Sequence, residues 1–192
     1  DILGLVELEN TDDTAIQHLR DRLNATLGPG TYEWVRSPFN GQDTIRVALL
    51  YKPGRGRLVG SAHATDPSPD QAYTVFKRPS LAQTFEPAGG GPRVTIAVNH
   101  FKSKGSCPAE GDPNADQGQG CWNRLRTEQA RQLGRFLDQV RRADGSTHAL
   151  IIGDLNAYGG EDPINALETA GFVDLIEDRL PPEARYTYFG TH

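Results

Sequence analysis

Three short apolar runs, each ending in polar side chains, dominate the pattern of this 192-residue sequence. They cover residues 2–6, 94–98 and 149–152. Their length and their content of branched aliphatic residues predict buried β-strands. Glu7 follows the first run, Asn99 and His100 follow the second, and Gly153 and Asp154 follow the third. The pattern therefore predicts three strands whose ends carry the chemistry of one composite site.

Apolar residues with helical spacing predict further elements between and after these strands. A stripe of Ala15, Ile16, Leu19, Leu23 and Leu27 predicts a helix over residues 11–27, with Thr11 or Asp12 as its cap, and residues 122–142 carry a second such stripe. Asp162 and Pro163 predict the start of a short helix that ends at Gly171. Strands are expected at residues 32–35 and 45–51, and residues 53–69 are rich in Gly, Pro and Ser and are expected to form an exposed loop.

The order of these elements limits the fold class. Two strands follow one another within residues 32–51 with only a turn between them, whereas a doubly wound parallel sheet needs a helix after nearly every strand. An α/β (α+β) fold of two packed mixed β-sheets with helices outside fits better. The length is that of a single domain, residues 1–192.

Composition changes the picture in two ways. Charged residues make up 23% of the chain, and the sequence has no run of apolar residues long enough to cross a membrane. The net charge of -5 is unusual for a protein that binds nucleic acid, which generally has a basic surface. A cleft needs only local positive charge, which Lys77, Arg78, Lys102, Lys104 and Arg46 can supply.

The two cysteines, Cys107 and Cys121, bracket a polar segment with few apolar residues to hold it in place. A disulfide between them would stabilise the fold by about 3 kcal/mol on a chain-entropy estimate. It would also indicate an oxidising compartment, extracellular or periplasmic. The alternative is two unrelated buried thiols. The spacing is not that of zinc ligands.

The segment from Gly153 to Tyr158 carries the most specific chemistry. Asp154 and Asn156 are two positions apart, so on an extended backbone both side chains point to one side. A carboxylate that orients water beside an amide that donates to a phosphoryl oxygen suits hydrolysis of a phosphate ester. The alternative is a strand end followed by an Asx turn.

Three motifs together resemble the endonuclease/exonuclease/phosphatase superfamily, whose fold is that of pancreatic-type deoxyribonuclease. They are residues 99–105 (NHFKSKG), 116–123 (DQGQGCWN) and 153–158 (GDLNAY). They are most similar to the secreted bacterial nuclease branch. The resemblance implies a four-layer αββα sandwich and a metal-dependent phosphodiesterase.

The resemblance also implies roles for the residues at the strand ends. Glu7 would be the ligand of Mg²⁺, with Mn²⁺ or Ca²⁺ as alternatives, and Glu9 is the competing candidate. His100 would stabilise or protonate the departing oxygen, Asp154 would orient the attacking water, and Asn156 would hold a nonbridging oxygen. The residues expected to contact substrate phosphate are Asn99, Lys102, Lys104, Arg46 and Tyr158. Arg46 lies inside an apolar strand, so it is expected to reach either the site or a carboxylate.

The sequence departs from the family pattern in several places. Val6 replaces a common glutamine, and Ile45 stands where some relatives have a glutamate that orients the histidine. The family also has an Asn ligand before the position of Glu7 and an Asp-His pair after the position of Tyr188, and neither is present here. Residues 186–192 resemble the strand before that pair, and His192 is not given its role. With no methionine either, the chain is expected to be a fragment incomplete at both ends and impaired in activity.

The sequence thus predicts an extracellular endonuclease that hydrolyses DNA, with RNA as a further substrate. The alternatives are a phosphatase or a sphingomyelinase-like phosphoesterase on the same fold, or a catalytically incomplete binding module. Nucleic acid is the expected partner, and nothing in the sequence indicates an obligate protein partner or a signal peptide within the chain.

Overall fold

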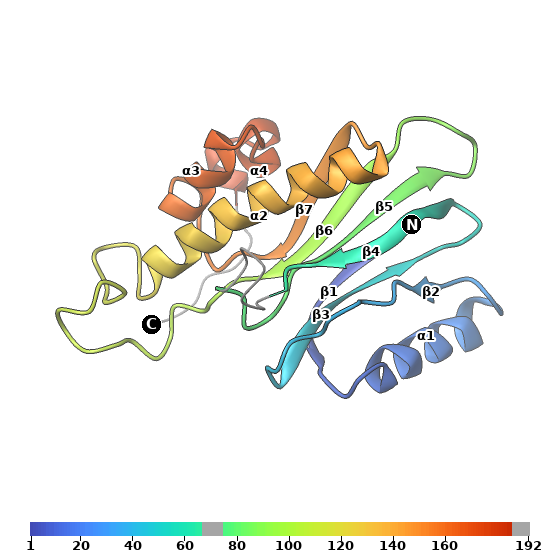
Figure 1. The fold of residues 1–192 in the computed structure, drawn as a ribbon, viewed down its shortest axis with the longest axis horizontal. Helices are drawn as coiled ribbons and strands as arrows, with labels where there is room; N and C mark the ends of the chain where they lie inside the picture. Colours follow the sequence, from blue (N-terminus) through green and yellow to red (C-terminus); the bar gives the residue numbers. More distant parts are fainter. Residues whose placement is uncertain (67–74, 186–192) are drawn as a thin grey trace.

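The protein forms four layers, helix, sheet, sheet and helix, in a computed structural model that describes residues 1–66 and 75–185 (Figure 1). Helix α1 (Thr14–Leu27) covers the outer face of a three-stranded sheet. Helix α2 (Asn123–Asp144) covers the outer face of a four-stranded sheet, and the two sheets face each other in the middle. The expected αββα sandwich is therefore confirmed.

The three-stranded sheet has the strand order β1-β3-β2. Its strands are β1 (Ile2–Glu9), β2 (Glu33–Trp34) and β3 (Ile45–Tyr51), and the described pairs are antiparallel. The interior of β3 is buried throughout, which agrees with its continuous apolar run. Its place in the centre of the sheet explains this burial.

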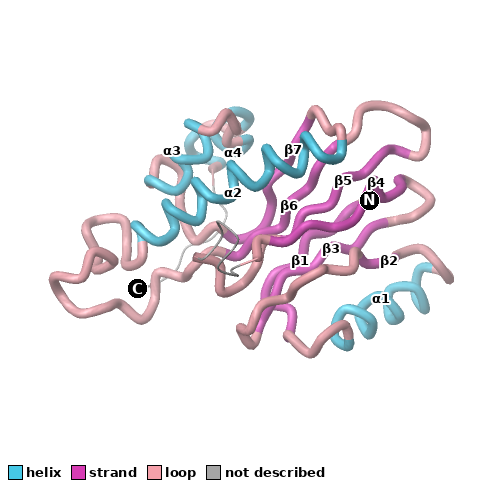
Figure 2. The backbone as a smooth tube through the Cα atoms, viewed as in Figure 1, coloured by secondary structure: helices cyan, strands magenta, loops and turns pink. Residues whose placement is uncertain are grey.

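The four-stranded sheet has the order β4-β5-β6-β7 and is mixed. Its strands are β4 (Gly56–Ala64), β5 (Leu81–Pro87), β6 (Val94–His100) and β7 (His148–Asp154). Among the strands that the structure describes, β6 and β7 form the parallel pair, and α2 makes the crossover between them, as a parallel connection requires. This crossover brings the ends of β6 and β7 side by side at the same end of the four-stranded sheet (Figure 2).

Gly145 caps the C-terminus of α2, and its left-handed conformation lets its backbone N–H donate to the carbonyl of Arg141. Beyond β7 follow α3 (Asp162–Thr169), α4 (Leu175–Arg179) and a single 3₁₀ turn (Pro182–Ala184). Helix α3 packs beside α2. Pro163 lies in the first turn of α3, as predicted, but the cap position is Glu161 rather than Asp162.

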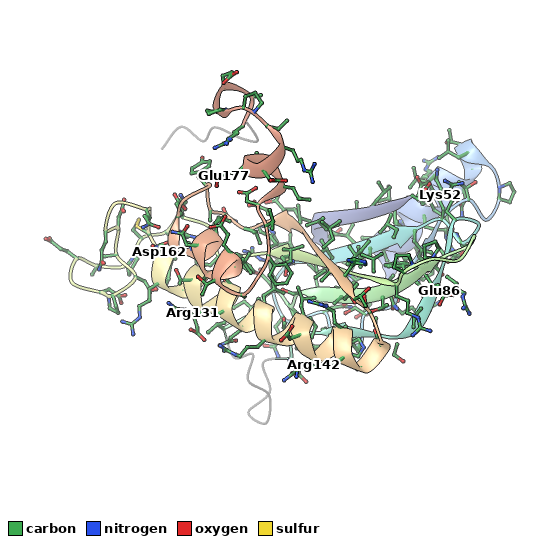
Figure 3. The ribbon with its side chains drawn as sticks, turned by 90° about the horizontal axis from the view of Figure 1, so that it is seen from above. Lys52, Glu86, Arg131, Arg142, Asp162 and Glu177 are labelled. Atoms are coloured by element: carbon green, nitrogen blue, oxygen red, sulfur yellow. A yellow bond between two sulfur atoms is a disulfide. The ribbon has the colours of Figure 1, made fainter. Side chains whose placement is uncertain are left out.

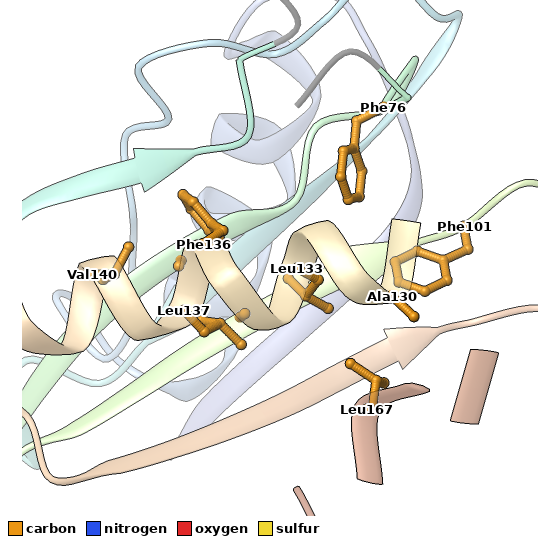
Figure 4. Close-up of a cluster of buried hydrophobic side chains, with 10 residues drawn as sticks. Phe76, Phe101, Ala130, Leu133, Phe136, Leu137, Val140 and Leu167 are labelled. Atoms are coloured by element: carbon orange, nitrogen blue, oxygen red, sulfur yellow. The ribbon is translucent and has the colours of Figure 1, made fainter. Parts of the chain in front are cut away.

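Three apolar clusters fill the three spaces between the layers. The space between α2 and the four-stranded sheet holds Phe76, Phe101, Leu133, Phe136 and Leu137 among other residues (Figure 4). A second cluster lies between the sheets, and a third lies between α1 and the three-stranded sheet. Each side chain of this size contributes about 1.5–3 kcal/mol when it is fully buried.

One predicted loop is in fact a strand. Residues 53–69 were expected to be an exposed loop, but β4 occupies Gly56–Ala64 and pairs with β5. The register shifts between Val59 and His63, which indicates a bulge, and Gly60 has a φ of 66°. An edge strand needs only one row of backbone hydrogen bonds and few apolar side chains, so its composition resembles that of a loop. Helix α4 was likewise not predicted from the sequence.

Candidate active site

The register of the parallel pair β6 and β7 brings His100 and Asp154 together. Asn99 lies opposite Gly153, and His100 lies opposite Asp154. Residues opposite one another on neighbouring strands have side chains on the same face of the sheet. The imidazole Nε2 of His100 is 3.8 Å from Oδ2 of Asp154. His100 is buried, whereas about half of the Asp154 side chain, 49%, is exposed to solvent.

A β-bulge in β1 brings the carboxylate of Glu7 into this site. The register of β1 against β3 shifts between Leu5 and Leu8, and both leucines pack against the α1 side of the sheet. In a regular strand, side chains three residues apart point to opposite faces of the sheet. Leu5 and Leu8 lie on the same face because a β-bulge between them accommodates one extra residue. Glu7 has a φ of 57° and is exposed. Burial lowers the pKa of His100, and the charge of Glu7 acts against this shift, so Glu7 lies within electrostatic range of that imidazole.

Arg78 is a cation at the centre of the site. Its Nε and Nη2 donate to the carbonyl oxygens of His100 (3.2 Å) and Phe101 (2.7 Å). Its Nη1 is 3.7 Å from a carboxylate oxygen of Asp43. Burial lowers the pKa of Arg78, while the charges of Asp43, Asp154 and Glu7 act to raise it, in decreasing order. One guanidinium thus lies among three carboxylates and fixes the end of β6.

Burial also lowers the pKa of His100 below its usual value of about 6.5. The charge of Arg78 adds to this shift, and the charges of Asp154, Glu7 and Asp43 oppose it. His100 is therefore neutral at pH 7, and a neutral imidazole has one donor and one acceptor nitrogen. Its Nδ1 is buried without a hydrogen-bond partner among the described residues.

The Asx turn considered as an alternative for the Gly153–Tyr158 segment is present. Oδ1 of Asp154 accepts a hydrogen bond from the backbone N–H of Asn156 at 2.8 Å, and Asn156 has a φ of 49°. The side-chain amide of Asn156 donates to the carbonyl of Phe101 at 3.1 Å. The turn and the composite site coexist, because Oδ2 of Asp154 still faces His100. The turn holds both side chains at the strand end.

The other predicted site residues fall into two groups. Lys102 extends over the ring of Trp122, with Nζ 4.9 Å from its centre, and Lys104 extends over Tyr158 at 4.5 Å. Burial and the nearby cations Arg78, Arg126 and Lys77 lower the pKa of Lys102. These lysines and Tyr158 follow β6 and β7 directly, beside the site.

Arg46 and Asn99 are directed elsewhere. Arg46 is buried, and its Nη2 contacts Oδ1 of Asp13 at 3.1 Å. Arg46 was expected to reach either the site or a carboxylate, and the structure shows it paired with a carboxylate. Asn99 is fully buried, and its amide donates to the carbonyls of Ala97 and Ile152. Because side chains alternate along β6, Asn99 lies on the opposite face from His100. Phosphate contacts by these two residues stay sequence-based predictions.

Sequence reasoning missed Asp43 and gave Arg78 only as one of several local cations. The sequence signal for Arg78 was its place directly before Pro79 and β5, where an arginine enters a largely buried segment. Asp43 lies in a polar turn before β3 and carries no such signal. Asp43 precedes Ile45, the position at which the family resemblance led us to expect an orienting glutamate, by two residues. Asp43 supplies a negative charge within range of His100 from this neighbouring position.

The predicted disulfide is present between Cys107 and Cys121, whose Cα atoms are 5.3 Å apart. It closes the loop that leads from β6 into α2. Cys121 is buried at the start of that helix, whereas Cys107 is exposed.

The residues at the site fit a hard divalent cation held by few protein ligands. Within residues 1–66 and 75–185, no three side chains of His, Cys, Asp or Glu gather as a metal-binding cluster. Mg²⁺, however, is commonly held by one or two carboxylates, with water and substrate phosphate as its other ligands. Glu7 offers such a carboxylate, exposed and close to the other site residues.

Comparison with protein families identifies the chain over its whole length. The family described as "Endonuclease/Exonuclease/phosphatase family" matches residues 1–192. The chain belongs to this family. Its members are hydrolases that act on phosphoester bonds, and the family generally uses divalent metals. A search of curated proteins found no match.

Solved structures with the same fold include members with different substrates. The human Nocturnin catalytic domain with bound sulfate is 24% identical, with a TM-score of 0.55 over 86% of this chain and 54% of that chain. ANGEL2, described as a 2',3'-cyclic phosphatase, is 18% identical, with a TM-score of 0.57 over 83% of this chain and 41% of that chain. A mannosyl-6-phosphatase from Bacteroides thetaiotaomicron is 16% identical, with a TM-score of 0.56 over 89% and 57%. The chain spans about half the length of these structures. At these identities the likeness shows the fold alone.

Proposed function

We propose that this protein is a metal-dependent phosphodiesterase that cleaves DNA, and that RNA is a further substrate. The observation that carries the proposal is the pairing of His100 with Asp154 at the ends of adjacent parallel strands, with the carboxylate of Glu7 in range of the same imidazole. A carboxylate can orient water, a neutral imidazole can donate to a departing oxygen, and an exposed acidic side chain can hold a divalent cation, and all three contribute to hydrolysis of a phosphodiester.

Asp154 orients the attacking water in this proposal. Its exposed carboxylate is fixed by the backbone of Asn156, so it accepts a hydrogen bond from water without rearrangement. Asn156 uses one N–H of its amide to bond Phe101, which leaves the other to donate to a nonbridging phosphoryl oxygen. His100, neutral at pH 7, donates a hydrogen bond to the departing oxygen.

Glu7 would hold the divalent cation. When bound there, Mg²⁺ or Mn²⁺ supplies positive charge that stabilises the phosphoryl oxygens of the transition state. Arg78, held by the backbone carbonyls of His100 and Phe101, adds a fixed positive charge at the end of β6.

Nucleic acid is the proposed substrate because the cation Lys102 follows His100 by two residues and lies beside the site. A chain of phosphates reaches past the scissile bond to such a group, whereas a small monoester does not. The disulfide supports an extracellular or periplasmic location, since such bonds persist in oxidising compartments. None of the described helices is long and apolar enough to cross a membrane.

The test is a substrate panel. Plasmid DNA, single-stranded RNA, a sugar phosphate monoester and sphingomyelin vesicles are each incubated with Mg²⁺, and again with EDTA. The assays use the 192-residue chain and, where its reading frame is longer, the complete product. We expect nicking of the plasmid that EDTA abolishes, with a slower rate for the 192-residue chain.

Each other outcome points to a different function. Release of phosphate from the monoester, or of phosphocholine from the vesicles, without nicking would favour the alternative phosphoesterases. Binding of DNA without hydrolysis of any substrate, in both forms of the protein, would favour a binding module. Nicking that persists in EDTA would overturn the metal-dependent mechanism.

A further inference from the structure

The loop that the disulfide closes lies against the loop that carries the site residues after β7. We call residues 102–121, which contain both cysteines, the disulfide loop and residues 155–161 the β7–α3 loop. The disulfide loop extends away from the two sheets beside the start of α3, and Figure 3 shows Asp162 where the two meet. Asn156 and Tyr158 lie on the β7–α3 loop, so contacts between the loops bear directly on the site.

Gln119 of the disulfide loop makes a two-way contact with Asp162. Its amide nitrogen donates to Oδ1 of Asp162 at 3.1 Å, and its amide oxygen accepts from the backbone N–H of Asp162 at 2.8 Å. Oδ2 of Asp162 accepts a further hydrogen bond from the side chain of Asn123 at 2.8 Å. Both hydrogen-bonding groups of Gln119 are therefore used at the first residue of α3, where the β7–α3 loop ends.

Lys104 joins the two loops a second time. Its Nζ is 2.5 Å from Oε1 of Glu161, and both side chains are mostly buried. The same ammonium group lies 4.5 Å from the ring centre of Tyr158. An ion pair with little solvent around it is screened far less than a surface pair. One cation thus fixes two residues of the β7–α3 loop.

Arg126 holds the base of the disulfide loop from inside the protein. It is fully buried, and its guanidinium donates to the carbonyls of Cys121 (2.7 Å), Lys102 (3.2 Å) and Gln119 (3.3 Å). These carbonyls belong to both arms of the loop. Both the disulfide and Arg126 therefore connect the two arms of the loop. The disulfide connects them covalently, and Arg126 connects them by charge-assisted hydrogen bonds.

We propose that Gln119 is a positioning residue, which, with the disulfide that fixes it, holds the β7–α3 loop and so sets the place of Asn156 and Tyr158 at the site. The effect on catalysis rests on the proposed phosphodiesterase function. The disulfide loop has no apolar core of its own, so it can act as a support only because its ends are tied. An error of about 1 Å in a site residue costs about 100-fold in rate, so a support of this kind affects turnover without contacting substrate.

The first test replaces Gln119 by alanine and uses Gln117→Ala as the matched control. Gln117 lies two residues away, is exposed, and makes no hydrogen bond to a described residue. We expect Gln119→Ala to lower kcat about 3- to 30-fold with KM for DNA nearly unchanged, on the strength of the two hydrogen bonds lost. Amide hydrogen exchange should become faster at residues 155–161 and stay unchanged in β5 and β6.

A second test restores the contact with different atoms. In Gln119→Glu the new carboxylate faces that of Asp162 and should lower kcat at least as far as alanine does. The pair Gln119→Glu with Asp162→Asn again places a donor opposite an acceptor, and it should recover most of the loss. The disulfide variant Cys107→Ser/Cys121→Ser should reproduce the exchange pattern of Gln119→Ala, and adding Gln119→Ala to it should have little further effect, because both act through one loop.

The exchange experiment separates this inference from the proposed function. If no substrate is hydrolysed but exchange at residues 155–161 rises in Gln119→Ala and not in Gln117→Ala, the support by Gln119 stands and the phosphodiesterase function fails. Exchange that is unchanged at residues 155–161 in both Gln119→Ala and the disulfide variant would overturn the inference, whatever the activity. If exchange at residues 155–161 becomes faster in Gln119→Ala but kcat stays normal, the claim that this support affects catalysis is overturned.

Discussion

At the level of single residues, Arg78 interacts with more of the site than any of the residues predicted to be catalytic or to bind metal. It donates to the backbone at both His100 and Phe101, and it is within electrostatic range of the three carboxylates Glu7, Asp43 and Asp154. Its charge therefore balances an otherwise acidic site and fixes the strand end that carries the imidazole. A lysine would not do the same, because it lacks the planar fork of donors.

Replacement of Arg78 by methionine should lower kcat/KM for DNA by about 10- to 100-fold, which corresponds to the loss of charged hydrogen bonds worth about 1.5–3 kcal/mol. The matched control is Arg93→Met. Arg93 also donates to a backbone carbonyl, that of Asp144, and pairs with Glu86, but it precedes β6 at the end away from His100. Steady-state kinetics should show little change in this control. Equal losses in the two variants would mean that Arg78 acts only through stability.

His100 predicts a dependence of stability on pH. Because burial lowers its pKa in the folded state, the unfolded chain binds a proton more readily than the folded protein. The contribution of this group to stability is therefore complete above a pH of about 6.5 and is lost as the pH falls from there through the lower folded-state pKa. Urea unfolding of wild type and His100→Gln between pH 7.5 and 5 should show a steeper loss in the wild type. Parallel curves would contradict the assignment of a neutral, buried His100.

At the scale of elements, the site depends on how closely β6 and β7 approach. Gly153 has a φ of 111°, and a Cβ atom there would lie 2.1 Å from the carbonyl oxygen of Asn99. Such a contact requires the backbones of the two strands to move apart. Since His100 and Asp154 are the next pair in this register, a glycine at 153 is a condition for the distance between them.

Gly153→Ala should therefore lower the free energy of unfolding by more than the strain of a side chain at a positive φ, because the added methyl group also clashes with the backbone of β6. Gly171→Ala is the control, since Gly171 has a φ of 91° and, within the described part of the chain, no residue beyond its immediate neighbours has an atom within 4 Å of the added methyl group. The control should cost about 1–2 kcal/mol, the strain of a left-handed residue with a side chain. Gly153→Ala should cost about 1–3 kcal/mol beyond that, as overpacking does. Equal free energies of unfolding from urea titrations would contradict the close approach.

The elements also show what the sequence could and could not predict. Strands β3, β6 and β7 and helix α2 have strong apolar periodicity, and their predicted positions agree with the structure to within a few residues. Strand β4 lacked that signal because it is an edge strand held by its backbone. The bulge that brings in Glu7 and the contact of Arg78 with β6 depend on register between distant segments, which local sequence does not encode.

At the scale of the whole molecule, the fold and the family followed from three motifs taken together. Two of the motifs lie at the ends of β6 and β7, which the sandwich places at the same end of the four-stranded sheet (Figure 2), and residues 116–123 lead into the start of α2. The placing of Arg46 against Asp13 and of Asn99 on the helix side of β6 shows the limit of this reasoning. Proximity in sequence to a motif does not decide on which face a side chain lies.

The proposed role of Asp154 is tested by the rate of plasmid nicking by Asp154→Asn relative to wild type, at equal protein and Mg²⁺ concentrations. Asp138→Asn is the control, because Asp138 is exposed on α2 and pairs only with arginines of its own helix among the described residues. If Asp154 orients the attacking water beside His100, Asp154→Asn should reduce the rate by about 10² to 10⁴ and leave the control near wild type. A rate for Asp154→Asn within twofold of the control would contradict the proposed site.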